Sequence, residues 1–148
     1  LDNQGDVFLN VGFGTGVYDG VKIFDGDLKE FELADVKILS EKVTLEKGTV
    51  NNGGSNIYEL ATQNGAKVVM VAENTNNNNK EFFEFGVIDN GTDISHTEYG
   101  NVRTGEQLIV PTFEKTASGF ARVNFDIGSS VTAGHNVVVT IVSNINKK

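Results

Sequence analysis

Apolar and polar residues alternate in short stretches along the chain. The strictest alternation covers residues 120–127. A period of two places successive side chains on opposite faces of a β-strand. Further strands are predicted at residues 6–11, 21–24, 31–39, 43–45, 67–72, 82–88, 94–99, 107–110 and 137–142. No stretch keeps a helical period of 3.6 residues for three turns, and residues 57–61 fit either a short helix or a strand.

Turn-forming residues separate these stretches. The chain has 17 glycines, 17 asparagines and one proline, and Gly and Asn tolerate the positive φ of tight turns. Asn90-Gly91 is a strong hairpin signal, Pro111 suits a sheet edge or bulge, and a parity change at Ala34-Asp35 indicates a bulge or strand break. The pattern predicts one all-β domain over residues 1–148, an antiparallel β-sandwich of jelly-roll or immunoglobulin-like type with about ten short strands.

The same pattern predicts which side chains form the core. The nearly continuous apolar run at residues 67–72 indicates a central strand that is covered on both faces. The alternating strands contribute one face each. The expected core comprises Val69, Val71, Phe83, Phe85, Val87, Val123, Phe125, Val138 and Val142.

Charge and composition limit the classes of partner. The net charge is −8, which argues against binding to nucleic acid through a basic face and against attachment to an anionic membrane surface. No apolar run approaches the roughly 18–20 residues of a spanning helix, and the polar start of the chain is unlike a signal peptide. The absence of cysteine excludes disulfides, thiolate nucleophiles and Cys-ligated zinc.

Two histidines are the candidates for acid–base chemistry. His96 lies within an expected strand, where alternation places it on the same face as Glu98. We interpret the two as a pair on a solvated face. His135 follows Ala133-Gly134 in a sequence typical of a turn. Neither histidine stands beside an evident nucleophile, so no catalytic residue is predicted.

Three other segments contain residue patterns that are found in ligand or modification sites. Asp25, Asp27 and Glu30 place three carboxylates in a short loop, as calcium favours, but lack the full EF-hand spacing and include a lysine. We expect a solvated turn there and no metal site. Residues 12–16 (GFGTG) lack the spacing, the lysine and the following helix of a phosphate loop. Asn90-Gly91-Thr92 is a formal glycosylation sequon. No cofactor is predicted.

Four motifs follow one another in the second half of the chain. They are NGAKVVMV at residues 64–71, EFGVIDNGT at 84–92, TEYGNVRTG at 97–105 and SGFARV at 118–123, before an alternating terminal strand. This order resembles a β-sandwich domain of virion structural proteins of tailed bacteriophages, marine and cyanobacterial ones especially. The match covers residues 64–148, and its most specific pieces are NGT and TEYG, spaced as one hairpin. Residues 127–130 depart from the usual Thr-Pro turn, and residues 74–79 are richer in asparagine than the pattern.

The resemblance implies a non-enzymatic structural protein of the virion, either a capsid decoration subunit or a tail or fibre component. The implied partners are other virion proteins and copies of itself in a symmetric homo-oligomer, without nucleic acid, membrane or cofactor. Residues 1–40 lie outside the resemblance. They are expected to form either an arm that contacts neighbouring subunits or extra strands of the same sandwich. Eight acidic residues against Lys22 and Lys29 within residues 1–35 would suit a basic neighbouring surface.

Two other classes of function compete with this hypothesis. A secreted bacterial β-sandwich that binds carbohydrate or acts as an adhesin fits the fold. The absence of Trp, with only three Tyr, disfavours it because sugars usually stack on aromatic faces. A small hydrolase on a β-scaffold is disfavoured by the positions of the two histidines and by the lack of cysteine.

Overall fold

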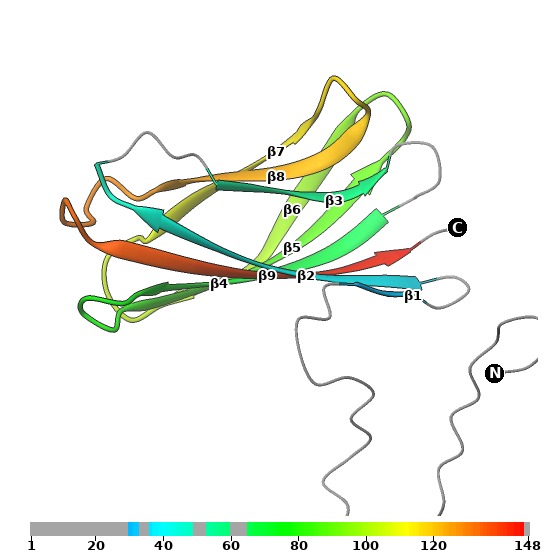
Figure 1. The fold of residues 1–148 in the computed structure, drawn as a ribbon. Helices are drawn as coiled ribbons and strands as arrows, with labels where there is room; N and C mark the ends of the chain where they lie inside the picture. The colour runs from blue at the N-terminus through cyan, green and yellow to red at the C-terminus, as the bar shows by residue number, and fades with distance from the viewer. Residues whose placement is uncertain (1–29, 33–35, 49–52, 60–64, 147–148) are drawn as a thin grey trace, which may run out of the picture.

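A computed structural model describes residues 30–32, 36–48, 53–59 and 65–146, and these residues form nine strands and no helix (Figure 1). The strands are β1 (Glu30–Glu32), β2 (Val36–Glu46), β3 (Gly53–Glu59), β4 (Gly65–Asn74), β5 (Lys80–Asp89), β6 (Ile94–Arg103), β7 (Ile109–Lys115), β8 (Phe120–Ile127) and β9 (Asn136–Asn146). The all-β prediction is therefore confirmed for the described residues. The strands predicted at residues 6–11 and 21–24 lie outside them.

The strands form two antiparallel sheets. The larger has the order β1-β2-β9-β4-β5-β6, and the smaller has the order β3-β8-β7. Figure 1 shows the smaller sheet lying across one face of the larger one. The chain passes from the larger sheet to the smaller between β6 and β7, so the segment at residues 104–108 connects the two layers.

The core lies between the sheets and draws side chains from both. Phe83, Phe85 and Val87 of β5 are buried, as are Val123 and Phe125 of β8, so these five predictions are confirmed. The rings of Phe83 and Phe85 stack at 5.7 Å between centroids. The remaining buried apolar side chains of this cluster are Leu45, Val68, Met70, Ala72, Leu108, Ile109, Ala121, Val131, Val137, Val139, Ile141 and Ile145.

The predicted core positions on the two central strands were wrong by one residue. Val68 and Met70 are fully buried, whereas Val71 is 39% exposed and Val69 is only half-buried. On β9, the buried residues alternate with Val138 and Val142, which point to the opposite face. β4 is central, between β9 and β5, but only one of its faces meets the second sheet. A continuous run of valines has no alternation, and so its phase cannot be read from the sequence.

Several boundaries also differ from expectation in an informative way. The parity change at Ala34-Asp35 falls between β1 and β2, which pair as antiparallel neighbours. Residues 43–45 belong to the same strand as 36–39, and residues 57–59 belong to strand β3 rather than a helix. Pro111 lies inside β7 instead of ending the preceding strand. It is accommodated because β7 is at the edge of its sheet.

Candidate functional site

His96 is part of an aromatic group rather than of a solvated pair with Glu98. Its ring lies 4.6 Å from that of Phe113 and 6.3 Å from that of Phe85, between centroids. Phe113 comes from β7 of the smaller sheet, and its ring meets that of Phe85 edge-on at 5.0 Å. Because His96 faces Val87 in the β5–β6 ladder, its side chain shares the inner face of the sheet. The His96 side chain is exposed, and its ring packs at the edge of the core.

His135 occupies the predicted turn and takes part in a polar cluster. Its backbone N–H donates to the Thr132 carbonyl at 3.1 Å, next to Gly134 with φ +78°. Its Nδ1 lies 3.1 Å from the Nδ2 amide of Asn74. Asn74 is fully buried at the end of β4, and its Oδ1 accepts a hydrogen bond from the Asn76 N–H. The histidine therefore holds a loop in place.

The asparagine-rich loop converges on the carboxylate of Glu106. Nδ2 of Asn77 donates to Oε1 at 3.1 Å and Nδ2 of Asn74 donates to the same oxygen at 3.3 Å, while Asn79 donates to Oε2. These hydrogen bonds, that from Asn77 first, lower the pKa of Glu106 below its ordinary value. The sequence predicted only a hydrophilic loop, because the contact with Glu106 is set by the fold.

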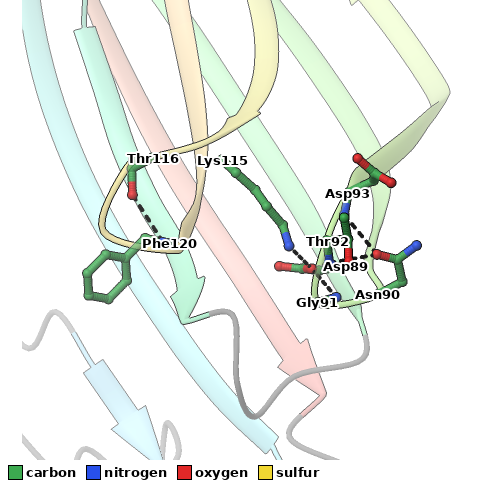
Figure 2. A network of polar contacts seen from close by, with 8 residues as sticks. All are labelled: Asp89, Asn90, Gly91, Thr92, Asp93, Lys115, Thr116 and Phe120. Carbon is green, nitrogen blue, oxygen red and sulfur yellow. Dashed lines mark hydrogen bonds and ion pairs between the residues drawn. The ribbon is translucent and has the colours of Figure 1, made fainter.

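A buried ion pair lies at the opposite end of β5. Lys115 Nζ is 2.6 Å from Asp89 Oδ1, and the Asp89 side chain is fully buried. Figure 2 shows Lys115 reaching from the β7–β8 hairpin to the turn that follows β5. Asp89 Oδ1 also accepts a hydrogen bond from Gly91 N–H at 2.8 Å. The pair links the two sheets at the D-N-G-T motif.

The sequon residues are engaged in the same turn. Asn90 Oδ1 accepts hydrogen bonds from the backbone N–H groups of Thr92 and Asp93, at 2.9 and 2.8 Å (Figure 2). Gly91 has φ +94°, which a side chain would strain. The Asn-Gly hairpin signal is thus explained, since these residues make the turn between β5 and β6.

A second buried carboxylate holds the connection between the sheets. Glu81 is 1% exposed, and its Oε2 accepts hydrogen bonds from the backbone N–H groups of Leu108 and Ile109 at 2.7 and 3.2 Å. Arg103 Nη1 lies 3.7 Å from the other carboxylate oxygen. Sequence reasoning missed Glu81, although a charged residue at an inward position of an alternating strand was a usable signal.

One shallow depression opens beside Tyr99, on the far side of the larger sheet from the core. It has a volume of about 370 Å³, and its lining includes Gly86, Ile88, Ser95 and Thr97. The Tyr99 ring lies over Gly86, where an added Cβ would come within 2.7 Å of the ring. Tyr99 is the extra residue of a bulge in the β5–β6 ladder. The two motifs of the resemblance that contain Gly86 and Tyr99 therefore contact one another.

The carboxylate loop of the sequence analysis lies mostly outside the described residues. Asp25 and Asp27 lie outside the described residues, and for Glu30 only its place in β1 is described. In the ranges that are described, no group of three or more His, Asp or Glu side chains could hold a metal ion. The same ranges contain no helix able to cross a membrane. Residues 12–16 are also outside these ranges.

The solved structures similar to the chain include two phage tailspikes. The Acinetobacter baumannii phage AM24 tailspike protein aligns with a TM-score of 0.47 and 12% identity, over 76% of this chain and 26% of the tailspike. The Acinetobacter phage vB_ApiP_P1 tailspike protein aligns with a TM-score of 0.45 and 14% identity, over 90% and 25%. The chain thus spans about a quarter of each tailspike. No family model and no curated protein matches it.

Proposed function

We propose that the chain is a non-enzymatic structural module of a tailed-bacteriophage particle, either a tail or fibre component or a capsid decoration subunit. In this proposal the two facing sheets form a β-sandwich of jelly-roll or immunoglobulin-like type. The module works by contacts with other virion proteins and with copies of itself. Residues 30–32 and 36–40 belong to strands β1 and β2 of the larger sheet, and so the proposed arm is limited to the residues before β1.

The observation that carries the proposal is the place of the resembling motifs in the fold. The DNGT motif makes the β5–β6 turn and supplies Asp89 to the ion pair with Lys115. The TEYG motif supplies Tyr99, whose ring lies on Gly86 of the preceding motif. The SGFARV motif begins at the β7–β8 turn, where Gly119 has φ +87°. These three motifs thus help to build the two-sheet body, which supports a structural role.

The two histidines support the same interpretation. His96 packs against Phe113, and the His135 ring nitrogen lies against a buried asparagine. Both side chains therefore serve packing and loop geometry. Replacing both by Gln is expected to lower thermal stability modestly and to leave incorporation into particles intact. A variant that folds and assembles but loses a measurable turnover would contradict the non-enzymatic proposal.

Localisation is tested on intact phage particles that encode the chain. An antibody raised against the purified protein, with gold labelling in electron microscopy, should decorate either the tail and its fibres or the capsid surface. The pattern of labelling decides between the two locations. Mass spectrometry of gradient-purified particles is the companion measurement. Absence of the chain from purified particles, with its presence in the lysate, would overturn the proposal.

One observation favours the alternative of a carbohydrate-binding module. The side chain of Tyr99 is 70% exposed and stands beside the hydroxyls of Ser95 and Thr97 in the depression. An exposed aromatic ring with nearby hydroxyls is a surface on which a sugar can stack. Binding on a glycan array that is abolished by Tyr99→Ala and retained by Val110→Ala would favour this alternative.

A further inference from the structure

The outer face of the larger sheet, the face turned away from the core, carries several exposed apolar side chains. The residues with large exposed apolar side chains number six in the described ranges, and five of them lie here. We define the outer-face patch as these five residues: Val71, Ile88, Tyr99, Val102 and Val142, which are between 39% and 70% exposed. Contiguous apolar patches on a protein surface mark interaction sites.

Three members of the patch, Val71, Val102 and Val142, are joined through cross-strand neighbours, while Ile88 and Tyr99 lie further along β5 and β6, beyond Glu84. Val71 of β4 is opposite Phe82 of β5, and Phe82 is opposite Val102 of β6. One row along, Val69 of β4 is opposite Val142 of β9. Phe82 and Val69 are half-buried within this surface. The apolar surface therefore extends across four neighbouring strands.

The charges on the outer face balance one another, and the Lys67–Glu84 ion pair lies among the patch residues. The strands β2, β4 and β5 place Lys42, Lys67 and Lys80, and Glu46, Glu73 and Glu84, on the outer face. Lys67 pairs with Glu84 at 2.8 Å, and Lys80 pairs with Glu73 at 3.6 Å. The face thus carries no net charge, although the whole chain carries −8. Two copies would repel one another through most of their surfaces but not through this one.

The extent of the face also suits a contact between copies. Five strands of ten or eleven residues (β2, β9, β4, β5 and β6), spaced about 4.8 Å apart, cover roughly 800 Å², close to what one partner contributes to a standard protein interface. A sheet face with equal numbers of positive and negative side chains can place opposite charges against one another under a two-fold rotation. The depression beside Tyr99 gives the face a recess for a side chain of the second copy.

We propose that the outer-face patch is the surface through which two copies of this chain associate, with the larger sheets packed face to face. The contact is of the kind found between packed sheets, about 10 Å apart. The inference rests on the proposed function for its biological role, since a particle supplies many copies of one subunit. Its physical basis is the described outer face.

Sedimentation equilibrium of the full 148-residue chain, from micromolar to millimolar concentration, tests the inference. The average mass of the wild-type protein should rise from that of a monomer to that of a dimer as the protein concentration increases. The double variant I88E/V102E places carboxylates in the patch and should raise the dissociation constant at least about tenfold. The matched control Val110→Glu alters an exposed valine of the smaller sheet and should leave the dissociation constant unchanged. Circular dichroism and thermal melting verify that each variant folds.

A charge-complementation experiment tests whether the surface that covers the patch is the same face of a second copy. Mixing I88E/V102E with I88K/V102K should restore association if the same face of each copy meets, because opposite charges then face one another. A wild-type chain that stays monomeric throughout, or double variants that dimerise as wild type does, would overturn the inference. Electron microscopy separates this failure from that of the proposed function. If the chain is monomeric but the antibody labels particles, only the association through the outer-face patch is contradicted. If the chain dimerises but is absent from particles, only the phage role is contradicted.

Discussion

The carboxylate of Asp89 and the ammonium of Lys115 meet at 2.6 Å and join the two sheets at one end of the fold. The Asp89 side chain is fully buried and that of Lys115 is 14% exposed. Asp89 also fixes the β5–β6 turn by accepting the Gly91 N–H. The pair therefore couples a turn of the larger sheet to the β7–β8 hairpin of the smaller one.

Removing one partner of this pair is expected to destabilise the protein strongly. Asp89→Asn keeps the acceptor for Gly91 but leaves Lys115 as an uncompensated buried charge. The free energy of unfolding, measured by urea denaturation, should fall by about 3–5 kcal/mol. Lys115→Met should have a similar effect, for the converse reason.

The double variant D89N/K115M distinguishes the pair from its separate members. It should lose clearly less stability than the sum of the single variants, because neither charge is then left alone. The control is Lys67→Met, which breaks the ion pair with Glu84 on the solvated outer face. That change should cost at most about 1 kcal/mol. Additive effects of D89N and K115M would show that the two groups do not interact.

The sequence indicated which face of a strand is buried where apolar and polar side chains alternate, and it did not where all residues are apolar. Residues 120–127 alternate strictly, and they form β8 with Val123 and Phe125 buried. In the run Val68-Val69-Met70-Val71 every residue is apolar, and so nothing local indicates which face meets the second sheet. That choice is made by the neighbouring strands β9 and β5, with which β4 pairs over its length.

The polar contacts were less predictable because they join segments distant in sequence. Asn90-Gly91 was readable as a turn from the two residues alone. The partner of Asp89 is Lys115, and the asparagines of residues 74–79 meet Glu106. These residues meet because the chain crosses from one sheet to the other and brings distant segments together. Local sequence patterns do not indicate such contacts. Val71 and Val142 of the outer-face patch had been predicted to lie in the core, and so the sequence did not indicate the patch.

Glu81 is expected to be essential for the connection between the sheets. Glu81→Ala leaves the buried N–H groups of Leu108 and Ile109 without their acceptor. The free energy of unfolding should fall by at least about 2 kcal/mol. Hydrogen exchange measured by NMR should accelerate at these two amides, beyond any change shared by the whole protein. Glu84→Ala, a neighbouring outer-face change on β5, serves as the control. Unaltered exchange at Leu108 and Ile109 in a folded Glu81→Ala protein would contradict the assignment.

Two glycines should respond very differently to the addition of a methyl group. A Cβ at Gly128 would lie 2.0 Å from the backbone oxygen of Gln107, which cannot move freely. A Cβ at Gly86 would meet only the ring of Tyr99, an exposed side chain that can swing aside. Gly128→Ala should therefore cost about 1–3 kcal/mol or more, and Gly86→Ala should cost clearly less. Thermal melting of both variants checks the order, and a reversed order would show that the contact at Gly128 is relieved by backbone movement.

The contacts of Glu106 predict a loss of stability in acid. Hydrogen bonds from Asn77, Asn74 and Asn79 hold the folded-state pKa of Glu106 below its ordinary value, which is about 4.3 in unfolded peptides. A lowered folded-state pKa means that the unfolded chain binds the proton first. The stabilisation is present above about pH 4.3 and is lost as the pH falls through the lower folded-state pKa. Melting temperatures recorded from neutral pH downward should therefore decline less steeply in Glu106→Gln than in wild type. Glu98→Gln removes one charge from an exposed residue of β6 without touching the asparagine loop, and so controls for net charge. Wild-type and Glu106→Gln proteins whose melting temperatures fall in parallel would contradict a role for Glu106 in this pH dependence.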